Sequence, residues 1–223
     1  MKIFFRDDDL GWDTLRFQRL LQIFQNNEAK LNVAAIPKIC YENFLKGTFS
    51  EFAPWMQVHT HGYAHVNWKA SGKRCEFDEN RSFEEVRTEL TQGITLLQEL
   101  FPQLYFPAFI PPWNNIAAKF IPLLPQAGYR MLSRSNSSNQ IPAPDIQNLD
   151  VSINLHSATQ KLQIPLKVVI EKIQQKKIAP VGILLHHAMM DDLDFIFLDQ
   201  LLKALLKAHI STHFMSEFEN ATA

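Results

Sequence analysis

The chain has 223 residues, of which 46% are hydrophobic, and a formal net charge of −1. This length can bury a sizeable core and suits one domain over residues 1–223 better than two. The signs of charge are interspersed, without the extended basic stripe that follows phosphates in nucleic-acid-binding proteins. No apolar run approaches the roughly 20 residues that span a bilayer. We therefore expect neither nucleic acid nor a membrane as a partner.

The N-terminus turns acidic before the apolar core of a signal peptide could form, which predicts a cytoplasmic protein. Cys40 and Cys75 are too few and too irregularly placed for a disulfide framework or a thiolate metal site. Both are expected to be reduced thiols without a functional role.

Short β-branched and aromatic runs alternate with longer segments of helical period, the pattern of βα units around a parallel sheet. The predicted strands cover residues 2–6, 31–36, 56–60, 104–109, 129–133, 151–155, 181–186 and 210–215. Predicted helices carry the apolar stripes 17–24, 86–97, 116–124, 166–173 and 198–205, with Asp13 as an N-cap and a capping box at Ser82. The polar stretches 69–79 and 133–148 are predicted as loops at a barrel mouth.

These elements predict one α/β domain, a small and distorted (β/α) barrel of about seven strands. A complete eightfold barrel would be cramped in a chain of this length. In such barrels catalytic groups lie just beyond the C-terminal ends of the strands. The polar clusters described next all lie at such strand ends.

Three consecutive carboxylates, Asp7, Asp8 and Asp9, follow the first apolar run. Like charges repel, so their retention at a strand end indicates a nearby cation or a shared proton. A solvated turn that caps the following helix is the alternative explanation.

Two histidines four residues apart, His61 and His65, follow the third predicted strand. Two imidazoles and a carboxylate from another strand form the smallest set that holds a divalent metal and leaves positions open for water. Gly62 lets the backbone turn so that the two rings converge. His59 shares a strand face with His61 and could support the ligands from behind. Spacing by chance is the alternative, because this motif alone is only moderately specific.

His186 and His187 close the apolar run 181–185, which must be a buried strand. An imidazole at that place can transfer protons near neutral pH, and we favour His186, while either of the two could instead hydrogen-bond to a loop. Asp150 opens a later strand. The segment 111–114 is as well explained by a stiff turn as by a wall of the substrate site.

In this order the clusters resemble the five motifs of the polysaccharide deacetylases, the carbohydrate esterase 4 superfamily. The matching segments are 6–11, 61–65, 109–113, 149–150 and 184–186. The resemblance covers almost the whole chain, and the second segment is its most specific part. It implies a distorted (β/α) barrel and a metal-dependent hydrolase.

The resemblance also implies roles for the first two motifs. The first Asp of the family's pair is the general base, and the second binds the metal together with two histidines. We align Asp8 as the base and Asp9, His61 and His65 as the ligands, because the next two residues then lie where the family turns away from the strand. Asp7 and Asp8 are the alternative pair. One divalent ion is implied, with zinc expected and cobalt, nickel and iron as alternatives.

Three departures from the family pattern concern the substrate more than the metal chemistry. The Arg that steadies the base in many members would fall at Ile110, so Asp8 must be oriented by another group, for which Arg6 is the candidate. The fourth motif lacks its Trp, and the final His is doubled. A subgroup of bacterial members with an unassigned substrate shows similar changes.

The predicted reaction is hydrolysis of an N-acetyl or related acyl group on a sugar. Asp8 would take a proton from the attacking water, and His186, tuned by Asp150, would protonate the departing amine. A backbone N–H near Trp113 would hold the oxyanion, with Pro112 and Trp113 as a wall, and Asp7, His59 and His187 would lie behind the reacting groups.

Two other functions stay open at this point. The first is hydrolysis of another non-peptide C–N bond in a small molecule. The second is a non-catalytic protein that binds metal or sugar and lost activity together with the Arg. The sequence leaves the oligomeric state undetermined.

Overall fold

The computed structural model describes residues 2–135, 143–155, 170–171, 173 and 180–219. Its strands form one all-parallel sheet in the order β6-β5-β4-β3-β2-β1-β8-β7. The strands are β1 (Ile3–Leu10), β2 (Leu31–Ala35), β3 (Met56–His61), β4 (Tyr105–Ile110), β5 (Met131–Leu132), β6 (Gln147–Asn148), β7 (Val151–Asn154) and β8 (Val181–Leu185). The predicted α/β barrel class is therefore confirmed.

The sheet curls until its two edges meet. β6 and β7 stand at opposite ends of the strand order, yet only Leu149 and Asp150 separate them in the chain. Ser135, just after β5, forms an isolated parallel bridge with Val151 of β7. β6 and β7 therefore act as one interrupted strand, and the barrel has the expected seven.

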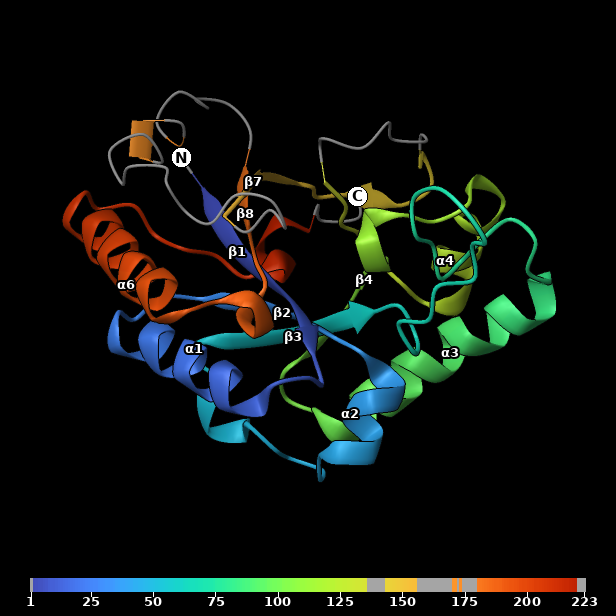
Figure 1. Ribbon diagram of the computed structural model, residues 1–223, viewed down its shortest axis with the longest axis horizontal. Coiled ribbons are helices and arrows are strands. Elements are labelled where there is room, and N and C mark those ends of the chain that lie inside the picture. Colours follow the sequence, from blue (N-terminus) through green and yellow to red (C-terminus); the bar gives the residue numbers. More distant parts are fainter. Residues whose placement is uncertain (1, 136–142, 156–169, 172, 174–179, 220–223) are drawn as a thin grey trace.

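Helices cover the outside of the curled sheet, with α1 and α6 side by side at one end and α3 at the other (Figure 1). They are α1 (Thr14–Asn26), α2 (Pro37–Asn43), α3 (Phe83–Leu100), α4 (Leu123–Ala127) and α6 (Asp192–Lys207). Short 3-10 turns occur at Ser50–Phe52, Pro112–Asn114, Ala118–Phe120, His187–Met189 and Met215–Phe218. Within the described part of the chain, no helix combines the length and the apolar character needed to cross a membrane.

The predicted N-cap at Asp13 and the predicted capping box at Ser82 are both confirmed. The Asp13 carboxylate accepts a hydrogen bond from the backbone of Arg16, and Ser82 and Glu85 form a reciprocal capping box. The stripe at 116–124 forms only a 3-10 turn followed by the short α4, because Pro122 and Pro125 remove backbone donors there. Most of the stripe at 166–173 lies outside the described residues.

Alternate residues of each strand face two different environments. Outward-facing side chains such as Phe5, Val33 and Ile183 pack under the helices, and inward-facing ones such as Phe4 and Leu184 fill the barrel. This alternation decides which way each functional side chain points at the end of a strand.

The eighth predicted strand, at 210–215, is wrong. Both edges of β1 are taken by β2 and β8, so this segment makes only one bridge, between Ile3 and Thr212. Its end is held by Asn32, whose side chain accepts from the Met215 backbone and donates to the His213 carbonyl. Met215 is fully buried in the barrel interior, so the segment closes one end of the barrel instead of extending the sheet.

Candidate metal centre

The three consecutive carboxylates of β1 point in three directions. Strand alternation turns Asp7 outward, toward the helices, and Asp8 inward, on the same face as Arg6. Between Asp7 and Leu10 the register against β2 shifts, so the strand bulges, and Asp9 adopts a φ of 78°. The bulge takes Asp9 out of the alternation and aims it at the barrel mouth.

Asp7 is fully buried and paired with His187. One of its oxygens accepts the His187 backbone N–H at 2.8 Å, and the other accepts the ring Nδ1–H at 2.6 Å. The ring Nε2 lies 2.8 Å from the Trp12 carbonyl. Both ring nitrogens face acceptors, and one of these acceptors is the Asp7 carboxylate. Burial lowers the pKa of His187, but the charge and hydrogen bond of Asp7 outweigh it and raise that pKa to about 9.

Asp8 is held by Arg6 in a two-pronged ion pair. Nε and Nη2 of Arg6 each donate to one carboxylate oxygen at 2.9 Å. The remaining donors of the guanidinium reach Ser133 Oγ and Asn114 Oδ1, both at 2.9 Å, and the Arg134 carbonyl at 3.4 Å. Arg6 is fully buried, and Asp8 is 2% exposed. Arg6 thus orients Asp8, the contact that the sequence suggested.

Asp9 meets the two histidines. Its Oδ1 lies 3.1 Å from His61 Nε2 and 3.3 Å from His65 Nε2, and one donor atom from each residue lies within 4.8 Å of the others. Burial raises the pKa of Asp9, but the hydrogen bonds with the two rings outweigh it and bring that pKa well below its usual range. Burial lowers the pKa of His61, but the hydrogen bond with Asp9 and the charges of Asp8 and Asp9 outweigh burial, so that pKa is raised.

The chemistry of this donor set fits a divalent transition ion. His61 Nδ1 donates to the Ile110 carbonyl at 3.0 Å, which fixes the ring so that Nε2 points toward Asp9 and is the nitrogen that could bind a metal. Ligand atoms that share one ion through bonds of about 2 Å lie about 3 to 3.5 Å apart, and Asp9 Oδ1 lies at such distances from both ring nitrogens. Two imidazoles and one carboxylate are the ligand set of an open catalytic zinc site.

A buried carboxylate that sequence analysis missed fixes the loop between the histidines. Glu76 accepts the backbone N–H of Tyr63 at 3.2 Å and of Ala64 at 2.7 Å. Gly62, at a φ of 62°, lets Glu76 and Pro112 lie directly on the backbone. Glu76 stands in a polar loop, and no pattern in the sequence connects it to the histidines.

His65 lies between two indole rings. The Trp12 ring is 4.8 Å and the Trp113 ring 4.4 Å from the imidazole, centroid to centroid. His65, Trp113 and Asn114 all have a positive φ, which L-residues rarely adopt. Strain of this kind persists where surrounding contacts determine the backbone, and it commonly marks functional sites.

Comparison with protein-family models gave no match, and comparison with curated proteins gave none. Solved structures match. A carbohydrate esterase family 4 pseudoenzyme from Bacillus anthracis is 13% identical with a TM-score of 0.62, over 98% of this chain and 65% of that one, and a mutant of it has restored activity. A family 4 carbohydrate esterase from Streptomyces lividans in complex with acetate is 12% identical with a TM-score of 0.61, over 100% and 97% of the chains.

A third structure, a peptidoglycan deacetylase from Bacillus subtilis, is 12% identical with a TM-score of 0.61, over 97% and 88% of the chains. The protein has the fold of carbohydrate esterase family 4. The chain spans about two thirds of the length of the pseudoenzyme and nearly all of the Streptomyces esterase.

The structure also describes the surroundings of three other predicted site residues, His186, Asp150 and His59. His186 is partly exposed, and its charge acts on Asp9, so it lies near the ligands. Its Nδ1 is buried and has no hydrogen-bond partner among the described residues. Asp150 accepts the Arg134 backbone N–H at 2.7 Å, and among the described residues no hydrogen bond joins it to His186.

His59 also differs from expectation. Its ring nitrogens lie 3.1 Å from the Phe106 carbonyl and 3.1 Å from Asn32 Oδ1, so it joins β3 to β4 and β2 below the mouth and does not support the ligands. Burial lowers the pKa of His59 to about 3, which keeps the ring neutral. His59 shares a strand face with His61, as expected, but it lies two residues earlier on β3 and therefore deeper inside the barrel than His61.

A Gly62→Ala substitution should weaken zinc binding about 10- to 100-fold, the range for losing support behind a ligand. The new Cβ would lie 1.9 Å from Glu76 Oε2, so the loop between the histidines must shift. Isothermal titration with zinc measures this effect. Gly72→Ala is the matched control, since Gly72 also has a positive φ but the atom nearest to its new Cβ, Lys69 Cε, is 4.0 Å away. Equal zinc affinities for the two variants would contradict the prediction.

The Asp7–His187 pair predicts a loss of stability at alkaline pH. The folded pKa of His187, about 9, lies above its ordinary 6.5, so the stabilisation is full below about pH 6.5 and disappears as the pH rises through 9. We expect the free energy of unfolding in urea to fall by up to roughly 3 kcal/mol across this interval. His187→Gln should be less stable than wild type near pH 6 and should lack this slope. An identical slope in both proteins would refute the assignment.

Proposed function

We propose that the protein is a metal-dependent hydrolase that removes an N-acetyl or related acyl group from a sugar or glycan. The observation that carries the proposal is the Asp9–His61–His65 cluster beside an Arg-paired Asp8, at the mouth of a family 4 barrel. The fold likeness supports the site's position, and the donor set supports a metal, with zinc expected. A bound divalent ion would polarise the acyl carbonyl and acidify water.

Asp8 is proposed as the general base. Its carboxylate is buried and held by two parallel hydrogen bonds, so it stays in one orientation at the mouth while a proton is transferred to it. Asp7 is the weaker candidate, because strand alternation turns it outward, where it is fully buried against His187 and faces away from the barrel interior. Asp9 is directed at the histidines, which leaves Asp8 and Asp9 as the favoured base and ligand pair.

His186 is proposed as the acid that protonates the departing group. It is partly exposed at the end of β8 and lies near Asp9, whereas His187 is buried with both nitrogens engaged. Trp113 and Pro112 form the wall beside His65, where an acyl group and the first sugar ring would lie.

Two variants test the ligand and base assignments. His61→Ala should lower zinc affinity by a factor on the order of 100 or more and abolish turnover, since one of three ligands is lost. Asp8→Asn should retain zinc and lose turnover by a factor on the order of 10³. Elemental analysis and acetate release from N-acetylglucosamine oligomers measure the two effects, with the exposed His209→Ala as control. Full zinc content in His61→Ala would exclude the proposed site.

Arg6→Lys tests whether Arg6 positions the base. A lysine keeps the charge but cannot hold both oxygens of Asp8 together with Ser133 and Asn114. We expect kcat to fall about 10- to 100-fold with zinc content and KM little changed. Arg81→Lys is the matched control, because Arg81 is also nearly buried and doubly bonded to a carboxylate, that of Glu89. Equal kcat values in both variants would refute the positioning role.

The same fold supports a second candidate, a protein that binds metal or sugar without catalysis. One structural neighbour of this chain is described as a pseudoenzyme. Zinc-loaded protein that binds sugar oligomers but cleaves no ester or amide in an acyl panel would favour it. Cleavage of a cyclic or other non-peptide amide without acetate release from sugars would favour the C–N hydrolase alternative.

A further inference from the structure

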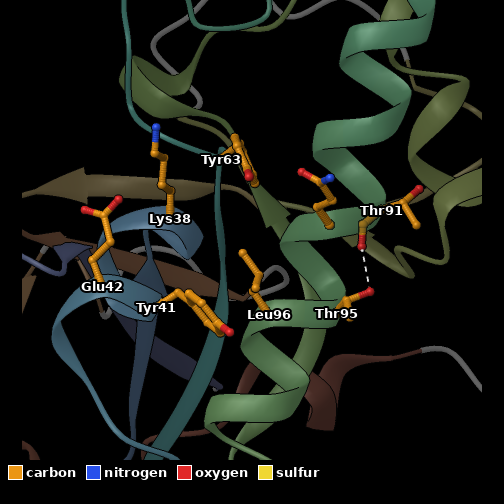
Figure 2. A pocket seen from close by; sticks show the side chains of 8 residues that line it. Lys38, Tyr41, Glu42, Tyr63, Thr91, Thr95 and Leu96 are labelled. Atoms are coloured by element: carbon orange, nitrogen blue, oxygen red, sulfur yellow. Dashed lines mark hydrogen bonds between the residues drawn. The ribbon is translucent and has the colours of Figure 1, made fainter.

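A pocket of about 460 Å³ lies between α2 and α3, outside the barrel (Figure 2). Its volume falls in the range of sites for small organic ligands. Figure 2 shows Tyr63 at one end, Tyr41 and Leu96 toward the other, and Lys38 and Glu42 along α2. None of these side chains has a part in the metal cluster.

The pocket shares a chain segment with the candidate metal centre. Tyr63 lies two residues from each of the ligands His61 and His65, and its backbone N–H is bound by Glu76. Its carbonyl accepts the Lys38 backbone N–H at 3.0 Å, which ties α2 to the same loop. A molecule in the pocket would therefore lie beside the segment that presents the metal ligands.

The lining combines apolar ring faces with neutral hydrogen-bonding groups. Tyr41 is 51% exposed and offers a ring face together with a hydroxyl. The Thr95 hydroxyl donates to the Thr91 carbonyl at 3.1 Å (Figure 2). The Thr91 hydroxyl donates to the Arg87 carbonyl at 3.0 Å. Their protons are used, so these oxygens are left as acceptors toward a ligand, and the Gln92 amide can both donate and accept.

The charges on the pocket wall balance. Lys38 and Glu42 stand one turn apart on α2, and no ion pair joins either of them to another described residue. One cation beside one anion does not select a phosphate or another anionic ligand. A sugar ring, with an apolar C–H face and hydroxyl groups around its edge, matches this lining.

We propose that the α2–α3 pocket is a distal subsite for a neutral pyranose ring. It would hold a ring of the same glycan whose acyl group lies at Asp9, His61 and His65. This inference rests on the proposed function and deepens it, because it specifies an oligosaccharide as the substrate and not a single acylated sugar.

Binding and turnover of β-1,4-linked N-acetylglucosamine with one and four rings test the subsite. Calorimetry on the full metal-free chain measures binding without turnover, and acetate release by the zinc-loaded chain measures kcat/KM. For wild type we expect both to favour four rings over one by about tenfold. Tyr41→Ala and Gln92→Ala should remove this preference and leave the single sugar unaffected.

Two controls separate the subsite from general effects. Tyr41→Phe keeps the ring, and Gln98→Ala removes an exposed glutamine from the same helix outside the pocket, so both should keep most of the preference. Equal values for one and four rings in wild type, no binding of the tetrasaccharide, or an unchanged preference in Tyr41→Ala would overturn the subsite. A Tyr41-dependent preference in binding without acetate release would overturn the proposed function alone, and acetate release without a length preference would overturn the subsite alone.

Discussion

Three adjacent carboxylates at the end of one strand repel one another unless each has its own positive partner, and the candidate centre depends on how this constraint is met. Asp7 is paired outward with the His187 imidazolium, Asp8 inward with Arg6, and Asp9 at the bulge with the two histidines. Arg6 lies on the same strand as Asp8, whereas His187 and the pair His61 and His65 come from distant parts of the chain. The folding of the barrel therefore supplies the partners of Asp7 and Asp9.

Arg6 connects several parts of the barrel. Its five N–H groups reach Asp8 on β1, Asn114 beyond β4, and Ser133 and Arg134 beyond β5. A buried guanidinium without acceptors would cost several kcal/mol, so each of these partners restrains the others. Ile110, where the resemblance would place an Arg, offers its carbonyl to His61. The cation that orients Asp8 lies on the same strand, two residues before it.

The periodicity of the sequence was sufficient for the fold class, the seven strands and the capped helices α1 and α3. It also predicted that Asp9, His61 and His65 lie close together, because the strand ends of a parallel barrel converge. The prediction of a strand at 210–215 was wrong, because the segment has the composition of a strand but no sheet edge is free to pair with it. Strand alternation alone could not tell how Asp7, Asp8 and Asp9 diverge, since the bulge between Asp7 and Leu10 is fixed by pairing with β2. The role of Glu76 could not be predicted from the sequence, because its partners are backbone N–H groups, which every residue type except proline carries.

Asp8 is the residue that distinguishes the proposed enzyme from a protein that only binds metal or sugar. A metal site needs only Asp9 and the histidines, and a sugar site needs only aromatic and polar walls. Neither use requires a second carboxylate at the mouth. Burying Asp8 with Arg6 requires the desolvation of two charges, and such pairs are often no more stable than an apolar replacement. A base that must take a proton in one fixed orientation is helped by the two parallel hydrogen bonds that Arg6 provides. The buried Asp8–Arg6 pair is therefore the structural feature that most favours the proposed catalysis.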